Sequence, residues 1–367
     1  MTNITEFRKR YHYDPIYDKI GEGGFAKVYK ARDNYYQRDV ALKFYYGSLG
    51  DRYSVQAEVE KMLEIQHPNL IQFYGVETLL APEEDLKAPD GKVQVGIMEY
   101  VNGGDFDDFM ASFPSQETIK KALTEILQAL AYLHDRGIIH RDIKPQNILM
   151  HHQNNQWIVK IGDFGLARQA ADSRLSSKLL GTVEYIAPEQ LDPTQFGKNG
   201  KLSTNVDLWG FGVIVAEIFT GESPFGNRNE GNTHEQVMFN ILKKDINEHI
   251  AQVPAPYKDM IAWCLRKHAE DRVQTAHQLL QLLEGKTAIS PAKTRSTATP
   301  IIEMPLSQAQ KITIFVICTL ASPLVGLVYY LFTKNRQPQN AKQVLQLLPF
   351  AGIAWLLLWL LLSWLFM

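Results

Sequence analysis

Two short motifs in the middle of the chain bring together residues that could transfer a phosphoryl group. The first is HRDIKPQN at 140–147, and the second is DFG at 163–165. Asp142 could accept a proton from a hydroxyl group, and Lys144 could contact a negatively charged phosphate. The asparagine that ends the first motif and the aspartate that begins the second offer hard oxygen ligands, which suit Mg²⁺. Such a set could move a phosphoryl group from Mg-ATP to a hydroxyl group.

These residues could instead form a polar turn before a hairpin, with Asp and Asn serving only as turn formers. Two segments upstream favour the chemical interpretation. The segment IGEGGFAKV at 20–28 has glycines that let a backbone approach phosphates and present amide N–H groups to them. It continues into an alternating, strand-like run, whereas a dinucleotide-binding fingerprint would open into a helix. A second segment, VALK at 40–43, ends an apolar strand with Lys43.

In this order and spacing, the motifs resemble those of the eukaryotic-type (Hanks-type) serine/threonine protein kinases over residues 14 to 285. The resemblance implies an α+β, bilobal protein-kinase fold. A small β-rich N-lobe is expected over about 14–98, and a larger helical C-lobe over about 102–285. ATP and Mg²⁺ are the implied cofactors, with Mn²⁺ as the alternative metal.

The resemblance assigns a role to each residue of the catalytic centre. Asp142 is expected to be the proton acceptor, and Lys144 to contact the transferred phosphate. Lys43 is expected to contact ATP, while Asn147 and Asp163 hold the metal. A lysine two residues after the catalytic aspartate is typical of the serine/threonine branch, because tyrosine kinases usually carry a different residue there.

An ion-pair partner for Lys43 is expected in the helix-like segment before His67. Counting back from His67, as the family pattern does, gives Glu58. Glu60 is the nearest alternative, but it lies two residues further on and faces another side of a helix. The prediction is therefore a Lys43–Glu58 pair.

The resemblance also predicts the surroundings of the nucleotide. Met98 would line the back of the adenine pocket, the backbone of Glu99 and Val101 would contact adenine, and Asp105 would contact the ribose. Ala26 stands where the family pattern has its third glycine. The expected ATP-contacting residues are Ile20, Gly21, Glu22, Gly23, Gly24, Phe25, Ala26, Val28, Ala41, Lys43, Met98, Glu99, Val101 and Asp105.

A third motif, APE, stands at 187–189, and the loop between it and DFG resembles an activation segment. Arg141 is expected to belong to a basic pocket that a phosphorylated residue of this loop would fill. Ser176 and Ser177 are the leading phosphorylation sites. Thr182 is expected mainly to form part of the substrate site, and a phosphorylation site is the secondary expectation for it.

Three features predict the interior of the large lobe. Apolar residues recur with a 3.6-residue period over 119–133, which indicates a helix buried along one face. The run DLWGFGV at 207–213 resembles a central buried helix whose aspartate anchors the catalytic loop, and Arg272 resembles the partner of Glu189. QNNQ at 153–156 predicts a hairpin turn.

The rest of the chain predicts a membrane anchor. Lys and Arg (38) nearly balance Asp and Glu (40), so nothing suggests a nucleic-acid partner. A Ser/Thr/Ala/Pro-rich linker is expected over 286–311, followed by charge-free segments at 312–332 and 344–366 that are long enough to span a lipid bilayer. We expect a two-helix hairpin with the kinase domain in the cytoplasm, where ATP is; one span plus a re-entrant segment is the alternative.

The sequence thus predicts a membrane-anchored serine/threonine kinase. It would phosphorylate protein substrates and its own activation loop, with self-association of tethered copies as the route to trans-autophosphorylation. The alternative is a membrane-tethered, ATP-binding scaffold with little or no transfer activity. The complete catalytic set favours the enzyme.

Overall fold

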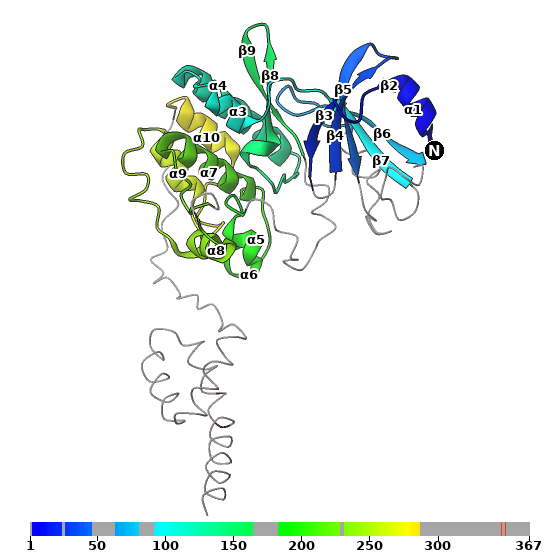
Figure 1. The fold of residues 1–367 in the computed structure, drawn as a ribbon. Helices are drawn as coiled ribbons and strands as arrows, with labels where there is room; N and C mark the ends of the chain where they lie inside the picture. Colours follow the sequence, from blue (N-terminus) through cyan, green and yellow to red (C-terminus); the bar gives the residue numbers. More distant parts are fainter. Residues whose placement is uncertain are drawn as a thin grey trace, which may run out of the picture. The chain divides into compact units, whose positions relative to one another are not determined.

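The computed structural model describes residues 2–23, 26–45, 63–80, 92–163, 183–227 and 231–286, together with Gln346 and Pro349. Residues 1–293 form one compact unit and 294–367 a second. The first unit contains a β-rich lobe and a helical lobe, as predicted (Figure 1). The elements of the second unit fall almost wholly outside the described residues.

The small lobe is built on a mainly antiparallel sheet of seven strands. Their order is β1-β6-β7-β5-β4-β2, and β3 pairs with β4. A short helix, α1 (Ile4–Arg10), lies between the first two strands. The strands are β1 (Thr2–Asn3), β2 (Tyr11–His12), β3 (Lys19–Glu22), β4 (Ala26–Asp33), β5 (Arg38–Tyr45), β6 (Phe73–Leu80) and β7 (Lys92–Glu99).

The register of this sheet gathers predicted nucleotide-binding residues on one face. Val28 on β4 lies opposite Lys43 on β5, and Ala41 lies opposite Met98 on β7. Ala41 and Lys43 are two residues apart, so their side chains share a face. Ala41 and Met98 are buried in the same cluster as the interior of the large lobe. This face is therefore turned towards the helical lobe.

The N-terminal residues cover the opposite face of the sheet. Phe7 and Tyr11 are 1% and 2% exposed and pack in a separate cluster that includes Val40 and Leu42. Helix α1 lies on the side of the sheet remote from the large helices (Figure 1). The small lobe thus begins before residue 14, the boundary that the family resemblance predicts. Ile4 packs beside this cluster, so the helical spacing of 4, 7 and 11 was a usable signal.

Truncating Phe7 is expected to destabilise the small lobe strongly. Phe7→Ala removes a buried ring and leaves a cavity, which typically costs about 3–5 kcal/mol of the free energy of unfolding. Urea unfolding of the full chain measures this, with Ile16→Ala (76% exposed) as control, for which a change within about 0.5 kcal/mol is expected. Equal effects of the two substitutions would contradict the packing of α1 on the sheet.

The large lobe is mainly helical. Its long helix α4 buries seven residues of the predicted apolar face, and α7 is buried along most of its length. A two-stranded sheet turns at Asn154 and Asn155, both at positive φ, which confirms the hairpin. The elements are α3 (Phe106–Ala111), α4 (Gln116–His134), η1 (Pro145–Asn147), β8 (Ile148–Gln153), β9 (Gln156–Ile161), α5 (Pro188–Leu191), α6 (Pro193–Phe196), α7 (Val206–Thr220), α8 (His234–Lys243), α9 (Tyr257–Cys264) and α10 (Ala276–Leu283).

Among the helices that the structure describes, none is both long enough and apolar enough to cross a membrane. The linker lies almost wholly outside the described ranges, and the first predicted span, 312–332, lies wholly outside them. Of the second span, 344–366, only Gln346 and Pro349 are described. The membrane anchor therefore stays a prediction.

Candidate active site

A buried carboxylate holds the loop that carries the predicted proton acceptor. Asp207, on α7, accepts hydrogen bonds from the backbone N–H of His140 (2.9 Å) and of Arg141 (2.7 Å). His134, at the end of α4, lies 2.9 Å from the same carboxylate. Arg141 has φ +68°, an uncommon conformation for a side-chain-bearing residue, and these contacts stabilise it. The predicted anchoring of the loop by Asp207 is confirmed.

His140 links this loop to the one that carries Asp163. Its Nδ1 accepts a hydrogen bond from the backbone N–H of Asp142 (3.3 Å), so the ring proton is on Nε2. Nε2 then donates to the carbonyl oxygen of Gly162 (2.9 Å). No role was predicted for His140, although it is the first residue of the motif. Its role depends on a contact 22 residues away.

Two residues of the first motif contact the predicted proton acceptor. Lys144 Nζ lies 3.3 Å from Oδ2 of Asp142. Asn147 Nδ2 donates to the same Oδ2 (3.1 Å) and to the backbone carbonyl of Asp142 (2.7 Å). The side chain of Asp142 remains 19% exposed, so it can meet a substrate hydroxyl group.

The two lobes meet at Lys43 and Asp163. The ammonium group of Lys43, from β5, contacts Oδ1 of Asp163, the aspartate of DFG. The side chain of Asp163 is 51% exposed, so desolvation raises its pKa only in part, and the charge and hydrogen bond of Lys43 hold this pKa below its ordinary value. Asp163 is therefore ionised at neutral pH.

The donor set around Asn147 and Asp163 fits a magnesium ion. The amide nitrogen of Asn147 is used towards Asp142, so its Oδ1 is the atom available to a cation. The N–H of Gly162, next to Asp163, donates to the carbonyl of Asn147 (2.9 Å), which keeps the two residues close. Among the residues with described positions, no group of three or more acidic, His or Cys side chains could hold a metal. Two oxygen-bearing side chains suit Mg²⁺, because it usually takes further ligands from phosphate and water.

The glycine-rich segment forms a hairpin of strands β3 and β4. Gly21 pairs with Val28, and the N–H of Gly23 donates to the carbonyl of Ala26 (2.8 Å). This antiparallel pairing of the two strands matches the expectation for a phosphate-covering loop. The predicted residues Gly24 and Phe25 lie outside the described residues.

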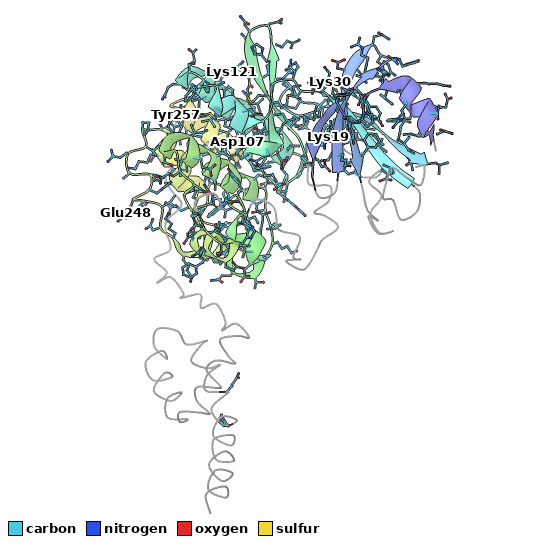
Figure 2. All side chains as sticks on the ribbon, in the orientation of Figure 1. Lys19, Lys30, Asp107, Lys121, Glu248 and Tyr257 are labelled. Carbon is cyan, nitrogen blue, oxygen red and sulfur yellow. The ribbon has the colours of Figure 1, made fainter. Side chains whose placement is uncertain are left out.

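Two predicted nucleotide contacts also have structural roles. The carboxylate of Glu99 pairs with Lys160 (2.7 Å), so the predicted adenine contact through its backbone would not need this side chain. Oδ1 of Asp105 accepts from the N–H groups of Asp107 and Asp108 (both 3.0 Å) and caps α3. Figure 2 shows Asp107 on the helical side of the molecule and Lys30 on the sheet. Val101 is partly buried, and Glu58 is not among the described residues.

The segment after the activation loop is fixed to the large lobe by an internal ion pair. Arg272 donates to both carboxylate oxygens of Glu189, at 2.5 and 2.7 Å, and both side chains are 0% exposed. The predicted pair is confirmed. Gln190, which the sequence analysis passed over, donates to the carbonyl of Arg141 (3.0 Å) and so ties this segment to the catalytic loop. Ser176, Ser177 and Thr182 lie outside the described residues, so the regulatory assignments stay predictions.

A second contact joins the same segment to α7. The hydroxyl of Tyr185 donates to Oε2 of Glu217 (2.7 Å). Burial raises the pKa of Glu217 to about 7, the negative charges of Asp107 and Glu184 add to this, and the bond from Tyr185 opposes it. Glu217 therefore changes its charge near neutral pH.

This pKa predicts a pH-dependent stability. Because the pKa of Glu217 is higher in the folded than in the unfolded chain, its stabilising contribution is full below about pH 4 and is lost as the pH rises through 7. Relative to Glu217→Gln, the wild-type free energy of unfolding should fall by roughly 3 kcal/mol between pH 4 and pH 8. Urea unfolding across this range measures it, with the exposed Glu6→Gln as control. Parallel profiles of wild type and Glu217→Gln would show that the carboxyl titrates normally.

Comparisons with known proteins agree with this geometry. A family model described as the protein kinase domain matches residues 15–282. Serine/threonine-protein kinase RAD53 of Saccharomyces cerevisiae is 30% identical over 60% of this chain and 27% of its own length. Serine/threonine-protein kinase PknB of Mycobacterium tuberculosis is 30% identical over 76% of this chain and 43% of its own length.

A solved structure is similar over the same region. The crystal structure of RAD53 residues 1–466 in complex with AMP-PNP has a TM-score of 0.58 and 28% identity, and covers 75% of this chain and 65% of that one. The chain spans less than half the length of the two curated relatives named above. The family model covers most of the chain and both lobes, so the chain belongs to the protein kinase family.

Proposed function

We propose that this chain is an active serine/threonine protein kinase, which transfers the γ-phosphate of ATP to Ser and Thr hydroxyl groups of proteins. The observation that carries the proposal is the convergence of Lys43, Asp142, Lys144, Asn147 and Asp163 in one site. The names of the relatives support the acceptor class, and the AMP-PNP complex of the solved relative supports ATP as the donor.

Each residue has a task that its position allows. Asp142 accepts the proton of the substrate hydroxyl group, and its contact with Asn147 orients the carboxylate for this task. Lys144, 3.3 Å from that carboxylate, offsets the negative charge of the transferred phosphate, and Lys43 binds the ATP phosphates from the other lobe. Asn147 and Asp163 would hold Mg²⁺, which neutralises and orients the phosphates when it is bound.

A transfer assay on the full chain tests the activity. The chain is incubated with ATP labelled in the γ-phosphate and a generic protein substrate, with Mg²⁺ or with a chelator. Label in the protein that depends on Mg²⁺ and on Asp142 is the expected result. ATP binding without transfer to any protein would instead favour the tethered scaffold.

We further propose that the two apolar segments anchor the kinase domain to the cytoplasmic side of a membrane. Their length and lack of charge support this, and tethering would raise the local concentration of copies for phosphorylation of Ser176 or Ser177 in trans. The full chain should stay in the membrane fraction after an alkaline wash, while a chain ending at residue 311 should be released. Release of both chains would refute the anchor.

A further inference from the structure

A hollow of about 560 Å³ lies in the small lobe, away from the candidate active site. It is formed between the N-terminal residues, the beginning of β5 and the beginning of β6. None of the predicted ATP-contacting residues that the structure describes lines it. The side chains that matter here are those of Arg10, Tyr36, Arg38, Tyr74 and Glu77, with Gly75 in the wall. Its volume is within the range of sites for small molecules or short peptide segments.

Arg38 is the feature that points to a ligand. Its guanidinium carbon lies 3.4 Å from the centre of the Tyr74 ring and 4.9 Å from that of Tyr36. Stacking on rings uses the faces of the guanidinium plane. Arg38 is also hydrogen-bonded to the side chain of Tyr74, and its other in-plane N–H donors are left for a ligand. One of these donors, Nε, is buried and has no hydrogen-bond acceptor. None of the described ion pairs includes Arg38, whereas Arg10, Asp33 and Glu77 nearby form ion pairs with one another.

The remaining charged groups near the hollow form their own network. Arg10 lies 3.4 Å from Asp33 and 3.6 Å from Glu77, and it stacks on Tyr11 at 4.7 Å. Asp33 and Glu77 are thus paired with Arg10, and no described ion pair gives Arg38 a carboxylate. A buried donor without an acceptor is costly, and an anion that accepts from it would remove this cost while also pairing with the charge of Arg38.

We propose that this hollow binds a phosphate monoester dianion, with Arg38 as its main ligand. The fork of in-plane donors on a guanidinium matches two phosphate oxygens at once, and stacking between Tyr36 and Tyr74 fixes that fork in place. Two sources share this chemistry: a phosphorylated Ser or Thr on a protein segment, and free phosphate. The site contains no residue of the candidate active site. Phosphate binding there can therefore be tested separately from the proposed kinase activity.

A binding experiment on the full chain tests the site. Saturating Mg²⁺ and a non-hydrolysable ATP analogue first fill the candidate active site. The probes are a dye-labelled phosphoserine peptide and its unphosphorylated twin, followed by fluorescence anisotropy, with inorganic phosphate as competitor. The phosphorylated peptide should bind at least about tenfold more tightly than its twin, because only the phosphate can accept charge-assisted hydrogen bonds from Arg38.

Two substitutions and one control locate the binding. Arg38→Gln should weaken phosphopeptide binding about tenfold or more. Gly75→Asp should do the same by placing a carboxylate in the hollow, where an added Cβ meets no atom within 4 Å. Arg32→Gln is the matched control, because Arg32 is already paired with Asp39 at 3.1 Å on the exposed surface and should leave binding unchanged. Thermal unfolding of each variant confirms that it is folded.

The outcomes separate the sources and can refute the site. If inorganic phosphate binds in an Arg38-dependent way and the peptide gains nothing over it, the source is free phosphate. If the peptide binds much more tightly than phosphate, the source is a phosphorylated protein. Two results would overturn the proposal. In the first, the phosphorylated and plain peptides bind equally and phosphate shows no Arg38-dependent binding. In the second, Arg38→Gln binds the phosphorylated peptide as tightly as wild type does.

Discussion

The Asp142→Asn variant is expected to lose roughly 10²- to 10⁴-fold in kcat, the range that a positioned proton acceptor contributes. The change keeps the shape of the side chain and removes its negative charge, so the hydroxyl proton has no acceptor. The substitution does not change Asn147 and Lys144, the two side chains that contact Asp142. The initial rate of peptide phosphorylation at saturating ATP measures the loss.

A surface aspartate gives the matched control for this prediction. Asp135 lies at the end of α4, its side chain is 59% exposed, and its partner is the exposed His277. Asp135→Asn should therefore leave kcat within about twofold of wild type, since surface changes of this kind are nearly neutral. A full rate in Asp142→Asn would mean that another group accepts the proton.

The second large effect is expected on stability, at the buried Arg272–Glu189 pair. Arg272→Leu leaves the carboxylate of Glu189 buried without its cation, which typically costs about 3–5 kcal/mol of the free energy of unfolding. The variant also removes donors to the carbonyls of Arg266 and Asn205. Urea unfolding of the full chain at pH 7 measures the cost.

Removing the acid as well should restore part of the lost stability. The double variant Arg272→Leu/Glu189→Leu no longer buries an unpaired charge, so the two single costs should not add. The exposed pair Glu6–Lys9 is the control, and Lys9→Leu should change stability by less than about 1 kcal/mol. Additive costs for Arg272 and Glu189 would mean that the two residues act separately.

Much of the large lobe could be predicted because the signals are local or recur as motifs. The 3.6-residue period over 119–133 directly reports the buried face of α4. The Arg272–Glu189 pair is not local, and it was predicted only through the family resemblance. The bidentate geometry and the complete burial of the pair needed the structure.

Other features could not be predicted because they depend on contacts between distant segments. The roles of His140 and Gln190 rest on bonds to Gly162 and Arg141, and neither residue type alone indicates them. The burial of Phe7 was missed for another reason: Arg and Lys surround the few apolar positions of the N-terminal residues and mask their helical spacing, yet Phe7 is among the most buried side chains. The proposed role of Arg38 could not be predicted, because the hollow forms only where β5, β6 and the N-terminal residues meet.

The most direct test of the central claim is the identity of the phosphorylated residue. The full chain is given γ-labelled ATP, Mg²⁺ and a peptide mixture that offers Ser, Thr and Tyr, and the labelled products are hydrolysed and separated. Label in phosphoserine and phosphothreonine, none in phosphotyrosine, and none with Asp142→Asn is the predicted result. Label confined to phosphotyrosine, or an equal yield from Asp142→Asn, would contradict a serine/threonine kinase that works through Asp142.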